Sequence, residues 1–337
     1  MRVAINGFGR IGKLVFRAFL EKNLKGAEIV AINELGSLDS SLHLMQFDSI
    51  HGKLPFDIKK SKDGLKYKNK TIKFFSERNP INLPWKKLKV DIVLECSGVF
   101  SSKEKSNAHI SAGAKKVIIS APASNVDATI VQGVNNQILT KKHNIISNGS
   151  CTTNCLAPVA MVLDKGVGIE SGFMTTIHSY TGDQRPVDQN HSDLRRARGA
   201  AISMIPTSTG AAKALSLVLP KMKGKLDGTA IRVPTPNVSL IDFTFTSKKK
   251  TTVERINNLA ISASKTKGLK NILTINKLPL VSIDFNHNSS SSIFDLTQTQ
   301  VINGRFCRVL SWYDNEWGFS NRMSDTAAIV AKTLWID

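Results

Sequence analysis

The chain has 337 residues, of which 41% are hydrophobic, and a formal net charge of +20. This length is enough to bury a large core and predicts a globular protein of two domains. No stretch reaches the roughly 18 consecutive apolar residues of a membrane span, and Arg2-Val3-Ala4-Ile5 is typical of a strand and not of a signal peptide. We therefore expect a cytoplasmic protein with no membrane partner.

Apolar strand-like runs alternate with amphipathic helical runs through the first half, which is the pattern of a parallel α/β sheet. The expected strands are residues 3–5, 29–32, 92–94, 117–119 and 145–146, and the expected helices are residues 11–22, about 38–47 and 104–112. We predict a doubly wound Rossmann domain over residues 1–150. A buried helix follows at 156–163, with Pro158 in its first turn, where a missing N–H costs little.

From about residue 170 the strand-like runs become longer. The expected strands are residues 173–178, 229–233, 238–246, 280–284, 292–296 and 305–313, with helices at 210–217 and 252–264. They predict an α+β catalytic domain over residues 151–317, with a mostly antiparallel or mixed sheet. The last helix, about residues 318–337, is expected to pack back onto the N-terminal domain.

The positive charge lies in scattered lysine pairs such as Lys59-Lys60 and Lys141-Lys142. These pairs lack the interleaved aromatic residues of a single-strand nucleic-acid platform. We expect a solvated lysine-rich surface and no dedicated nucleic-acid partner. A basic nucleic-acid-binding or scaffold protein is the alternative from another functional class.

A dinucleotide fingerprint opens the chain. Residues Gly7 to Gly12 match G-x-G-x-x-G directly after a strand and at the start of a helix, where Gly7 makes the tight turn and Gly9 lets the backbone approach a pyrophosphate. Glu34 ends the second strand, where a carboxylate can accept hydrogen bonds from the adenosine ribose and repel a 2′-phosphate. NAD is therefore favoured over NADP.

Cys151 lies in the segment Ser150-Cys151-Thr152-Thr153-Asn154-Cys155, where a helix is expected to begin. The partial positive charge of a helix N-terminus favours ionisation of a thiol. His178 ends a later strand and could activate the thiol as a base. A zinc site of Cys151, Cys155 and His178 lacks a fourth ligand and C-x-x-C spacing, so we predict no metal.

The other cysteines have simpler interpretations. Four cysteines in a chain of this size do not form a disulfide framework. Cys96 and Cys307 lie in apolar strand-like runs and are expected in the core. Cys155, one helical turn after Cys151, is expected to pack within the same helix.

Arginines and hydroxyl residues in separate loops supply the groups that phosphate recognition needs. Arg232 lies inside an apolar strand, where a charge requires a partner. With these residues in view, the chain resembles the phosphorylating glyceraldehyde-3-phosphate dehydrogenases over essentially its whole length. The similarity rests on residues 5–12, 150–155, 178–184, 206–213, 232–237 and 312–316.

The resemblance implies a role for each matching residue. Cys151 is the nucleophile and His178 the base. The positions that bind the phosphate of the substrate and the incoming inorganic phosphate are Ser150, Thr152, Thr181, Arg196, Thr209, Gly210 and Arg232. The cofactor positions are Asn6, Gly7, Gly9, Arg10, Ile11, Glu34, Arg78, Ser120 and Asn315.

The implied reaction oxidises glyceraldehyde 3-phosphate with NAD through a thiohemiacetal and a thioester, which inorganic phosphate cleaves to 1,3-bisphosphoglycerate. A homo-oligomer, a tetramer in the family, is also implied. Erythrose-4-phosphate dehydrogenase is the alternative on the same fold. Two departures affect the preference for NAD: Glu34 stands where many members have Asp, and the loop 187–191 lacks the family's common Leu-Pro before its histidine.

Overall fold

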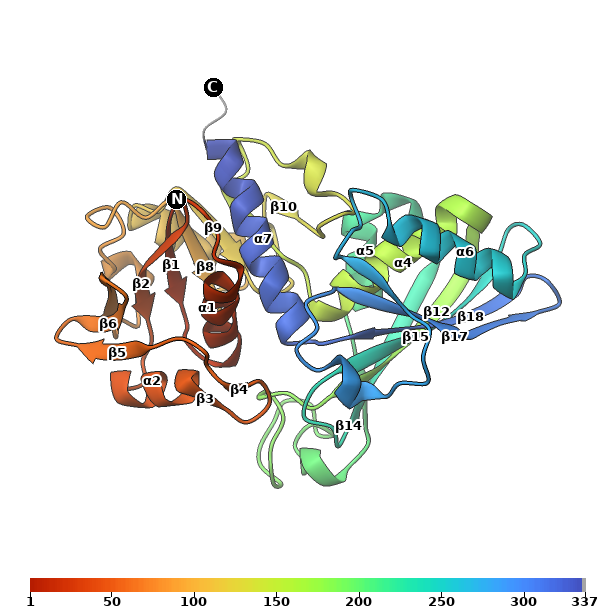
Figure 1. Cartoon of the computed structure of the whole chain (residues 1–337), viewed down its shortest axis with the longest axis horizontal. Coiled ribbons are helices and arrows are strands. Elements are labelled where there is room, and N and C mark those ends of the chain that lie inside the picture. Colours follow the sequence, from red (N-terminus) through yellow and green to blue (C-terminus); the bar gives the residue numbers. More distant parts are fainter. Residues whose placement is uncertain (335–337) are drawn as a thin grey trace. The chain divides into compact units, whose positions relative to one another are not determined.

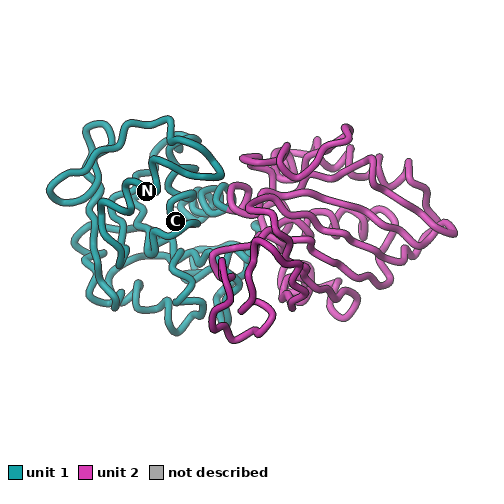
Figure 2. The backbone as a smooth tube through the Cα atoms, turned by 90° about the horizontal axis from the view of Figure 1, so that it is seen from below, with its two compact units in different colours: residues 1–130, 136–149, 320–337 teal, residues 131–135, 150–319 magenta. Residues whose placement is uncertain are grey.

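The computed structural model describes residues 1–334, and the predicted end of the last helix, residues 335–337, lies outside the described residues. The chain divides into two compact units (Figure 2). Unit 1 comprises residues 1–130, 136–149 and those from Ser320 onward, and unit 2 comprises residues 131–135 and 150–319. Figure 1 labels their helices and strands.

Unit 1 is built on a parallel sheet that continues into antiparallel hairpins. Its strand order is β10-β11-β9-β8-β1-β2-β7-β6-β5. The strands are β1 (Arg2–Asn6), β2 (Glu28–Asn33), β5 (Ile58–Ser61), β6 (Gly64–Tyr67), β7 (Lys70–Phe75), β8 (Ile92–Glu95), β9 (Lys116–Ile119), β10 (Ala128–Thr129) and β11 (Ile145–Ser147). All neighbours from β10 to β7 pair in parallel, whereas β5, β6 and β7 form an antiparallel meander. The predicted Rossmann class is confirmed.

Helices of unit 1 follow its strands. They are α1 (Arg10–Lys22), α2 (Leu38–Gln46), α3 (Lys103–Ser111) and most of α7 (Trp317–Leu334), and a small ribbon joins β3 (Phe47–Asp48) to β4 (Gly52–Lys53). Leu14, Val15 and Phe16 of α1 are buried, which fits an amphipathic helix covering a sheet. The fully buried strand residues Val3, Ala4 and Ile5 are typical of a parallel sheet.

Unit 2 carries a mixed sheet in the order β13-β14-β12-β15-β18-β17-β16. Its strands are β12 (Ile169–Ser179), β13 (Ile205–Ser208), β14 (Leu226–Val233), β15 (Ser239–Ser247), β16 (Leu273–Asn276), β17 (Ser292–Ile302) and β18 (Phe306–Tyr313), and its helices are α4 (Cys151–Val167), α5 (Ala211–Val218) and α6 (Val253–Ser264). In Figure 1 these three helices lie together on one side of the sheet. The core packs apolar residues of α4, such as Leu156 and Leu163, with Phe243 and Phe245 of β15.

Two sequence predictions are wrong here. The helix begins at Cys151, within the segment where a helix start is expected, and the Ser150 hydroxyl caps it by accepting a hydrogen bond from the backbone N–H of Thr153. Pro158 therefore lies inside α4 and not in its first turn. The strand predicted at 280–284 is the 3-10 helix Ser282–Phe285.

Among residues 1–334, none of the helices combines the length and hydropathy of a membrane-spanning segment.

Candidate active site

Cys151 is the first residue of α4, directly after the Ser150 cap. The Ser150 side chain accepts a hydrogen bond of 3.0 Å from the Thr153 N–H, so it satisfies one of the free donors at the helix start. The other N–H groups of this first turn give the Cys151 thiol a partially positive surrounding. Cys155, one turn later, is fully buried and lies 3.5 Å from the Ser292 hydroxyl, as expected for a packed core residue.

His178 lies near the end of β12 and faces this thiol. The Cys151 Sγ is 3.5 Å from the His178 Nε2. On the other side of the ring, Nδ1 lies 2.7 Å from the backbone carbonyl of Ser179, which can accept a hydrogen bond from a protonated Nδ1. In that tautomer the Nε2 lone pair points at the thiol, which is the arrangement a general base requires.

Burial dominates the electrostatics of the pair. Burial, followed by the charges of Arg232 and Arg196, lowers the pKa of His178 to about 3, although the Ser179 carbonyl acts in the opposite direction. Burial also raises the pKa of the Cys151 thiol, while Arg232 and hydrogen bonds at Thr152 partly oppose that rise. The pair therefore consists of a neutral thiol beside an unprotonated imidazole.

Arg232 is brought next to His178 by the sheet. The strands β12 and β14 pair in parallel with His178 opposite Arg232. The Arg232 Nη1 lies 3.1 Å from His178 Nδ1, 3.2 Å from the Ser179 carbonyl and 3.3 Å from the Thr181 hydroxyl. Its Nε is buried and has no hydrogen-bond partner within residues 1–334. A half-buried guanidinium with a buried, unused donor is suited to an anionic ligand.

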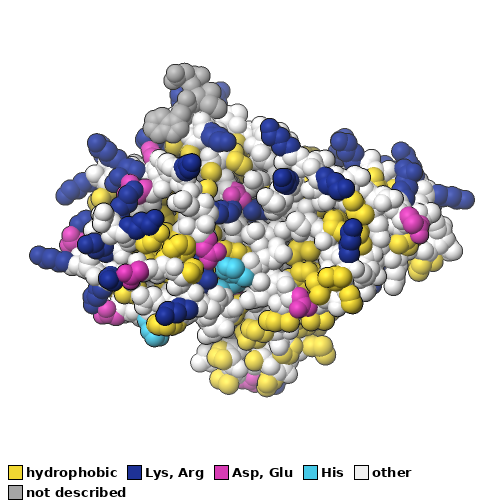
Figure 3. Space-filling view, viewed as in Figure 1, with side chains coloured by type: hydrophobic (Ala, Val, Ile, Leu, Met, Phe, Trp, Pro, Cys, Tyr) yellow, Lys and Arg dark blue, Asp and Glu magenta, His cyan; other side chains and the backbone are white. Residues whose placement is uncertain are grey.

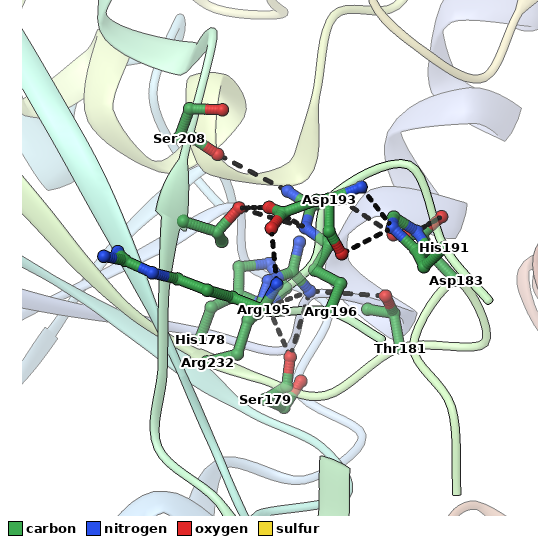
Figure 4. Close-up of polar contacts among 11 residues, drawn as sticks. His178, Ser179, Thr181, Asp183, His191, Asp193, Arg195, Arg196, Ser208 and Arg232 are labelled. Carbon is green, nitrogen blue, oxygen red and sulfur yellow. Dashed lines mark hydrogen bonds and ion pairs between the residues drawn. The ribbon is translucent and has the colours of Figure 1, made fainter. Parts of the chain in front are cut away.

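Arg196 is the second arginine of this region and comes from the loop after β12 (Figure 4). Its Nη1 is 2.8 Å from an Asp183 carboxylate oxygen, and its Nε donates to the Thr207 hydroxyl over 3.1 Å. Both Arg196 and Arg232 act on the pKa of His178, so the two cations belong to one electrostatic environment.

The remaining predicted phosphate residues are at helix starts. Gly210 precedes α5, and the Thr209 hydroxyl accepts a hydrogen bond of 3.2 Å from the Ala211 N–H. Thr152 differs from its expected role, because its hydroxyl is buried and lies 2.9 Å from the Tyr313 hydroxyl. From Thr152, only backbone groups remain to face a ligand.

Asn315 follows β18 and is buried. Its Oδ1 accepts hydrogen bonds of 2.9 Å from the hydroxyls of both Ser179 and Ser239. These two bonds hold the Asn315 amide in one orientation. Since Ser179 is the last residue of β12, the amide lies beside the end of the strand that carries His178.

Unit 1 contains a separate cavity of about 290 Å³ at the carboxyl ends of β1, β2 and β8. Its lining is Asn6, Gly7, Gly9, Asn33, Glu34, Leu35, Glu77, Arg78, Cys96, Ser97, Val99 and Phe100. Five predicted cofactor residues thus meet in one place. Such an edge of a doubly wound sheet is where dinucleotides bind.

Each glycine of the fingerprint lacks a side chain for a different structural reason. Gly7 has φ of +84°, and a Cβ there would lie 2.5 Å from the backbone of Ser97. A Cβ at Gly12 would lie 2.1 Å from the Gly7 carbonyl, so Gly12 permits the close packing of α1 on the turn. Gly9, by contrast, faces open space, with nothing within 4 Å of an added Cβ. The cradle is therefore shaped for a ligand at Gly9.

Glu34 is already anchored in this cavity. One carboxylate oxygen accepts a hydrogen bond of 2.6 Å from the Phe8 N–H, and the other accepts one of 3.0 Å from the Gly36 N–H. These bonds tie the end of β2 to the glycine turn. A negative charge is thereby fixed where an adenosine ribose would lie.

Three predicted cofactor residues, Arg10, Ile11 and Ser120, are outside the cavity lining. Arg10 makes a two-bond ion pair with Asp48, at 2.7 and 3.0 Å. The Ser120 N–H donates to the Glu95 carbonyl, directly after β9.

Sequence reasoning missed the segment that follows β8, Cys96 to Phe100, although it lines the cavity. Glu95 holds it in place. This buried carboxylate accepts a hydrogen bond of 2.7 Å from the Ser97 N–H and contacts Asn6 and His109. The available signal was that an expected strand at 92–94 ends in a glutamate at the same sheet edge as Gly7.

No group of three or more His, Cys, Asp or Glu side chains suited to a metal is found in the part of the chain that the structure describes.

A dinucleotide-type fold together with a thiol beside an imidazole defines the class: the chain is an NAD-dependent oxidoreductase. Two family models divide the sequence between them. Residues 1–103 match the glyceraldehyde 3-phosphate dehydrogenase NAD binding domain, and residues 150–315 match the glyceraldehyde 3-phosphate dehydrogenase C-terminal domain. The chain belongs to the glyceraldehyde-3-phosphate dehydrogenase family.

Its curated relatives are similar along their whole length. Glyceraldehyde-3-phosphate dehydrogenase of Xanthobacter flavus is 58% identical over 332 residues, which cover 98% of this chain and 99% of the relative. The protein of the same name from Cereibacter sphaeroides is 54% identical over 334 residues, with 99% of each chain covered. The one from Zymomonas mobilis is 55% identical over 335 residues, again with 99% of each covered. The resemblance noted from the sequence is therefore confirmed.

Proposed function

We propose that the protein oxidises D-glyceraldehyde 3-phosphate to 1,3-bisphosphoglycerate with NAD and inorganic phosphate. The observation that carries this proposal is the Cys151 thiol, 3.5 Å from the unprotonated His178 ring, beside Arg232, whose buried Nε has no hydrogen-bond partner in the described residues. The chain's relatives carry the name of this enzyme. On this proposal, residues 1–150 with the last helix bind the cofactor and residues 151–317 carry out catalysis.

Cys151 and His178 perform the first half of the reaction. As the sulfur adds to the aldehyde carbon, Nε2 takes the thiol proton, and the Ser179 carbonyl stabilises the imidazolium through Nδ1. The imidazolium then gives this proton to the former carbonyl oxygen, which completes the thiohemiacetal, and the neutral ring removes it again when the thiohemiacetal is oxidised. NAD, when bound, supplies the hydride acceptor for this oxidation. The product on Cys151 is a thioester.

Arginines and hydroxyls serve the phosphates. Arg232 with Thr181, and Arg196 with the start of α5 at Thr209 and Gly210, offer donors to the phosphate of the substrate and to the attacking inorganic phosphate. Ser150 and Thr152 contribute at the start of α4. Inorganic phosphate then attacks the thioester carbon, the carbon–sulfur bond breaks to release 1,3-bisphosphoglycerate, and the proton held by His178 returns to the leaving Cys151 sulfur.

Residues of the unit 1 cavity fit NAD. Gly9 leaves room for the pyrophosphate, and Asn6, Gly7 and Arg78 line the same space. The anchored Glu34 carboxylate accepts from ribose hydroxyls and repels a 2′-phosphate, which favours NAD over NADP. Arg10, Ile11 and Ser120 lie around this edge, and Asn315 holds the nicotinamide carboxamide.

An initial-rate assay tests the activity. We expect NADH formation from glyceraldehyde 3-phosphate to depend on inorganic phosphate, with NAD preferred to NADP and glyceraldehyde 3-phosphate preferred to erythrose 4-phosphate. Turnover at full rate without phosphate would refute the phosphorylating assignment, because water would then cleave the thioester. Preference for erythrose 4-phosphate would favour the alternative enzyme of the same fold.

We also infer a homo-oligomer, a tetramer by family resemblance, in the cytoplasm. Four apolar side chains of the loop region 187–204 are largely exposed in the single chain: Val187 (67%), Leu194 (81%), Ile202 (86%) and Met204 (76%). Exposed apolar groups of this density are typical of a surface that a partner covers. A monomeric mass in analytical ultracentrifugation would contradict the inference.

The surface charge supports no competing role. Lysine and arginine side chains are distributed across the face shown in Figure 3, with acidic side chains among them. Several lysines of the chain form ion pairs, including Lys60 with Asp39 and Lys73 with Asp63. We therefore propose small phosphorylated metabolites, and not nucleic acid, as the anionic partners.

A further inference from the structure

The guanidinium of Arg196 is held by groups of its own loop and of β13. Its Nε donates to the Thr207 hydroxyl over 3.1 Å, and its Nη2 lies 3.4 Å from the Ser208 carbonyl. Its Nη1 pairs with the Asp183 carboxylate over 2.8 Å. Figure 4 shows Asp183 and Ser208 reaching Arg196 from different directions. An anion that binds Arg196 therefore meets a guanidinium that already makes hydrogen bonds to Thr207, Ser208 and Asp183.

The Thr207 side is braced. The Thr207 hydroxyl donates to Asp193 over 2.7 Å while it accepts from Arg196, so Asp193 orients the hydroxyl. Asp193 is itself fixed, because its second oxygen accepts a hydrogen bond of 2.9 Å from the Arg195 N–H. Thr207 is buried within β13, which pairs with β14. The contacts through Thr207 therefore fix the orientation of the Arg196 side chain, and an incoming anion does not readily replace them.

The Asp183 side is different. The side chain of Asp183 is 52% exposed, and within residues 1–334 its other oxygen has a single long contact, 3.5 Å, with His191 Nε2. Arg196 and His191 lower the pKa of this carboxyl against the effect of burial, so it is ionised at neutral pH. An exposed ion pair of this kind contributes little to stability and can be replaced by another anion.

We propose that Asp183 is a competing anion for Arg196: a phosphate group that binds this arginine competes with the Asp183 carboxylate for the Nη1 side of the guanidinium, so Asp183 weakens phosphate binding. The inference rests on the proposed function, which makes Arg196 a phosphate ligand. Displacement exchanges one charge-assisted hydrogen bond for another, and the Thr207 and Ser208 contacts keep the guanidinium in place meanwhile. Asp183 thus acts through Arg196 as a positioning and affinity-setting residue.

The test compares Asp183→Asn with the unsubstituted full-length protein. We expect the KM for the phosphate species that Arg196 contacts to fall about two- to five-fold, the size of effect that an exposed ion pair can have. The kcat is expected to change less than the KM. Varying inorganic phosphate and glyceraldehyde 3-phosphate separately shows which of the two supplies that phosphate group. Asp183→Glu, which keeps the charge, is expected to restore the original KM.

Asp188 provides a matched control on the same loop. It forms an equally short ion pair, 2.8 Å, with Arg198, which is not a proposed phosphate ligand. Asp188→Asn is expected to leave both KM values unchanged. An equal fall in this control would mean that the loss of any negative charge suffices, and would overturn the specific role of Asp183.

Direct binding separates this inference from the proposed function. The rise in Tm caused by added inorganic phosphate needs no catalysis, and it is expected to be larger for Asp183→Asn than for the unsubstituted protein. An equal or smaller rise, or unchanged or increased KM values, would overturn the inference. Absence of aldehyde oxidation in the unsubstituted protein would instead refute the proposed function. The binding measurement would still show whether Asp183 competes with phosphate for Arg196.

Discussion

Cys151→Ser is expected to abolish NADH formation, with a loss on the order of 10⁴-fold or more, while NAD binding stays intact. The hydroxyl that replaces the thiol is a far weaker acid, so His178 cannot generate a comparable nucleophile at neutral pH. Losing the nucleophile of a covalent mechanism removes nearly all of its rate enhancement. Steady-state rates measure the loss, and titration calorimetry with NAD measures cofactor binding.

Cys155 is the natural control for this substitution. It lies on the same helix, but its thiol contacts Ser292 and the Ser311 carbonyl in the core. Cys155→Ser is expected to retain a kcat near that of the unsubstituted protein. In the absence of phosphate, intact-mass analysis should show a glyceroyl phosphate adduct on the unsubstituted chain and none on Cys151→Ser. Normal turnover by Cys151→Ser would rule out the thioester route.

His178→Asn is expected to slow acylation of Cys151 by about 10²- to 10⁴-fold, the usual size of a general-base contribution. Asparagine keeps a donor that can reach the Ser179 carbonyl, but it has no basic nitrogen at the position of Nε2. Because burial and the nearby arginines lower the pKa of His178 to about 3, its ring is unprotonated throughout the neutral range, and the Nε2 atom lies 3.5 Å from the Cys151 thiol.

Rapid-mixing measurement of the first NADH turnover isolates this step from later ones. The burst rate is expected to fall while the KM for phosphate changes little. Added imidazole should restore part of the rate, because it can enter the space that the shorter side chain leaves. A burst at the original rate would show that another group deprotonates the thiol.

The parallel core of unit 1 was predictable because each strand carries its own apolar run, as in residues 92–94 and 117–119. The strands β5 and β6 were missed, since each has only four residues and together they contain three lysines and a glycine; they become strands by pairing in the order β5-β6-β7. The opposite error occurred at residues 280–284. Val281 and Ile283 look like strand residues but are 59% and 70% exposed, with no neighbouring strand to pair with in the described chain.

The chemistry of the site was predictable to the extent that it depends on local sequence. A cysteine after a helix-capping serine and a histidine at a strand end are visible as motifs. The contacts of Arg196 with Asp183 and Thr207 are not, because they depend on how the loop after β12 folds against β13. Thr152 shows the same limit, since its hydroxyl is taken up by Tyr313, 161 residues later in the chain.

The division of the chain into units has a consequence for its synthesis. Unit 1 consists of residues from three separate stretches, and its last stretch begins only at Ser320. The Lys22 ammonium, for example, pairs with Asp325 over 2.6 Å. At about 5–20 residues per second, the ribosome adds the intervening unit 2 over roughly ten seconds or more. The cofactor-binding half of the protein therefore begins to fold first and is completed last, after the half that carries Cys151.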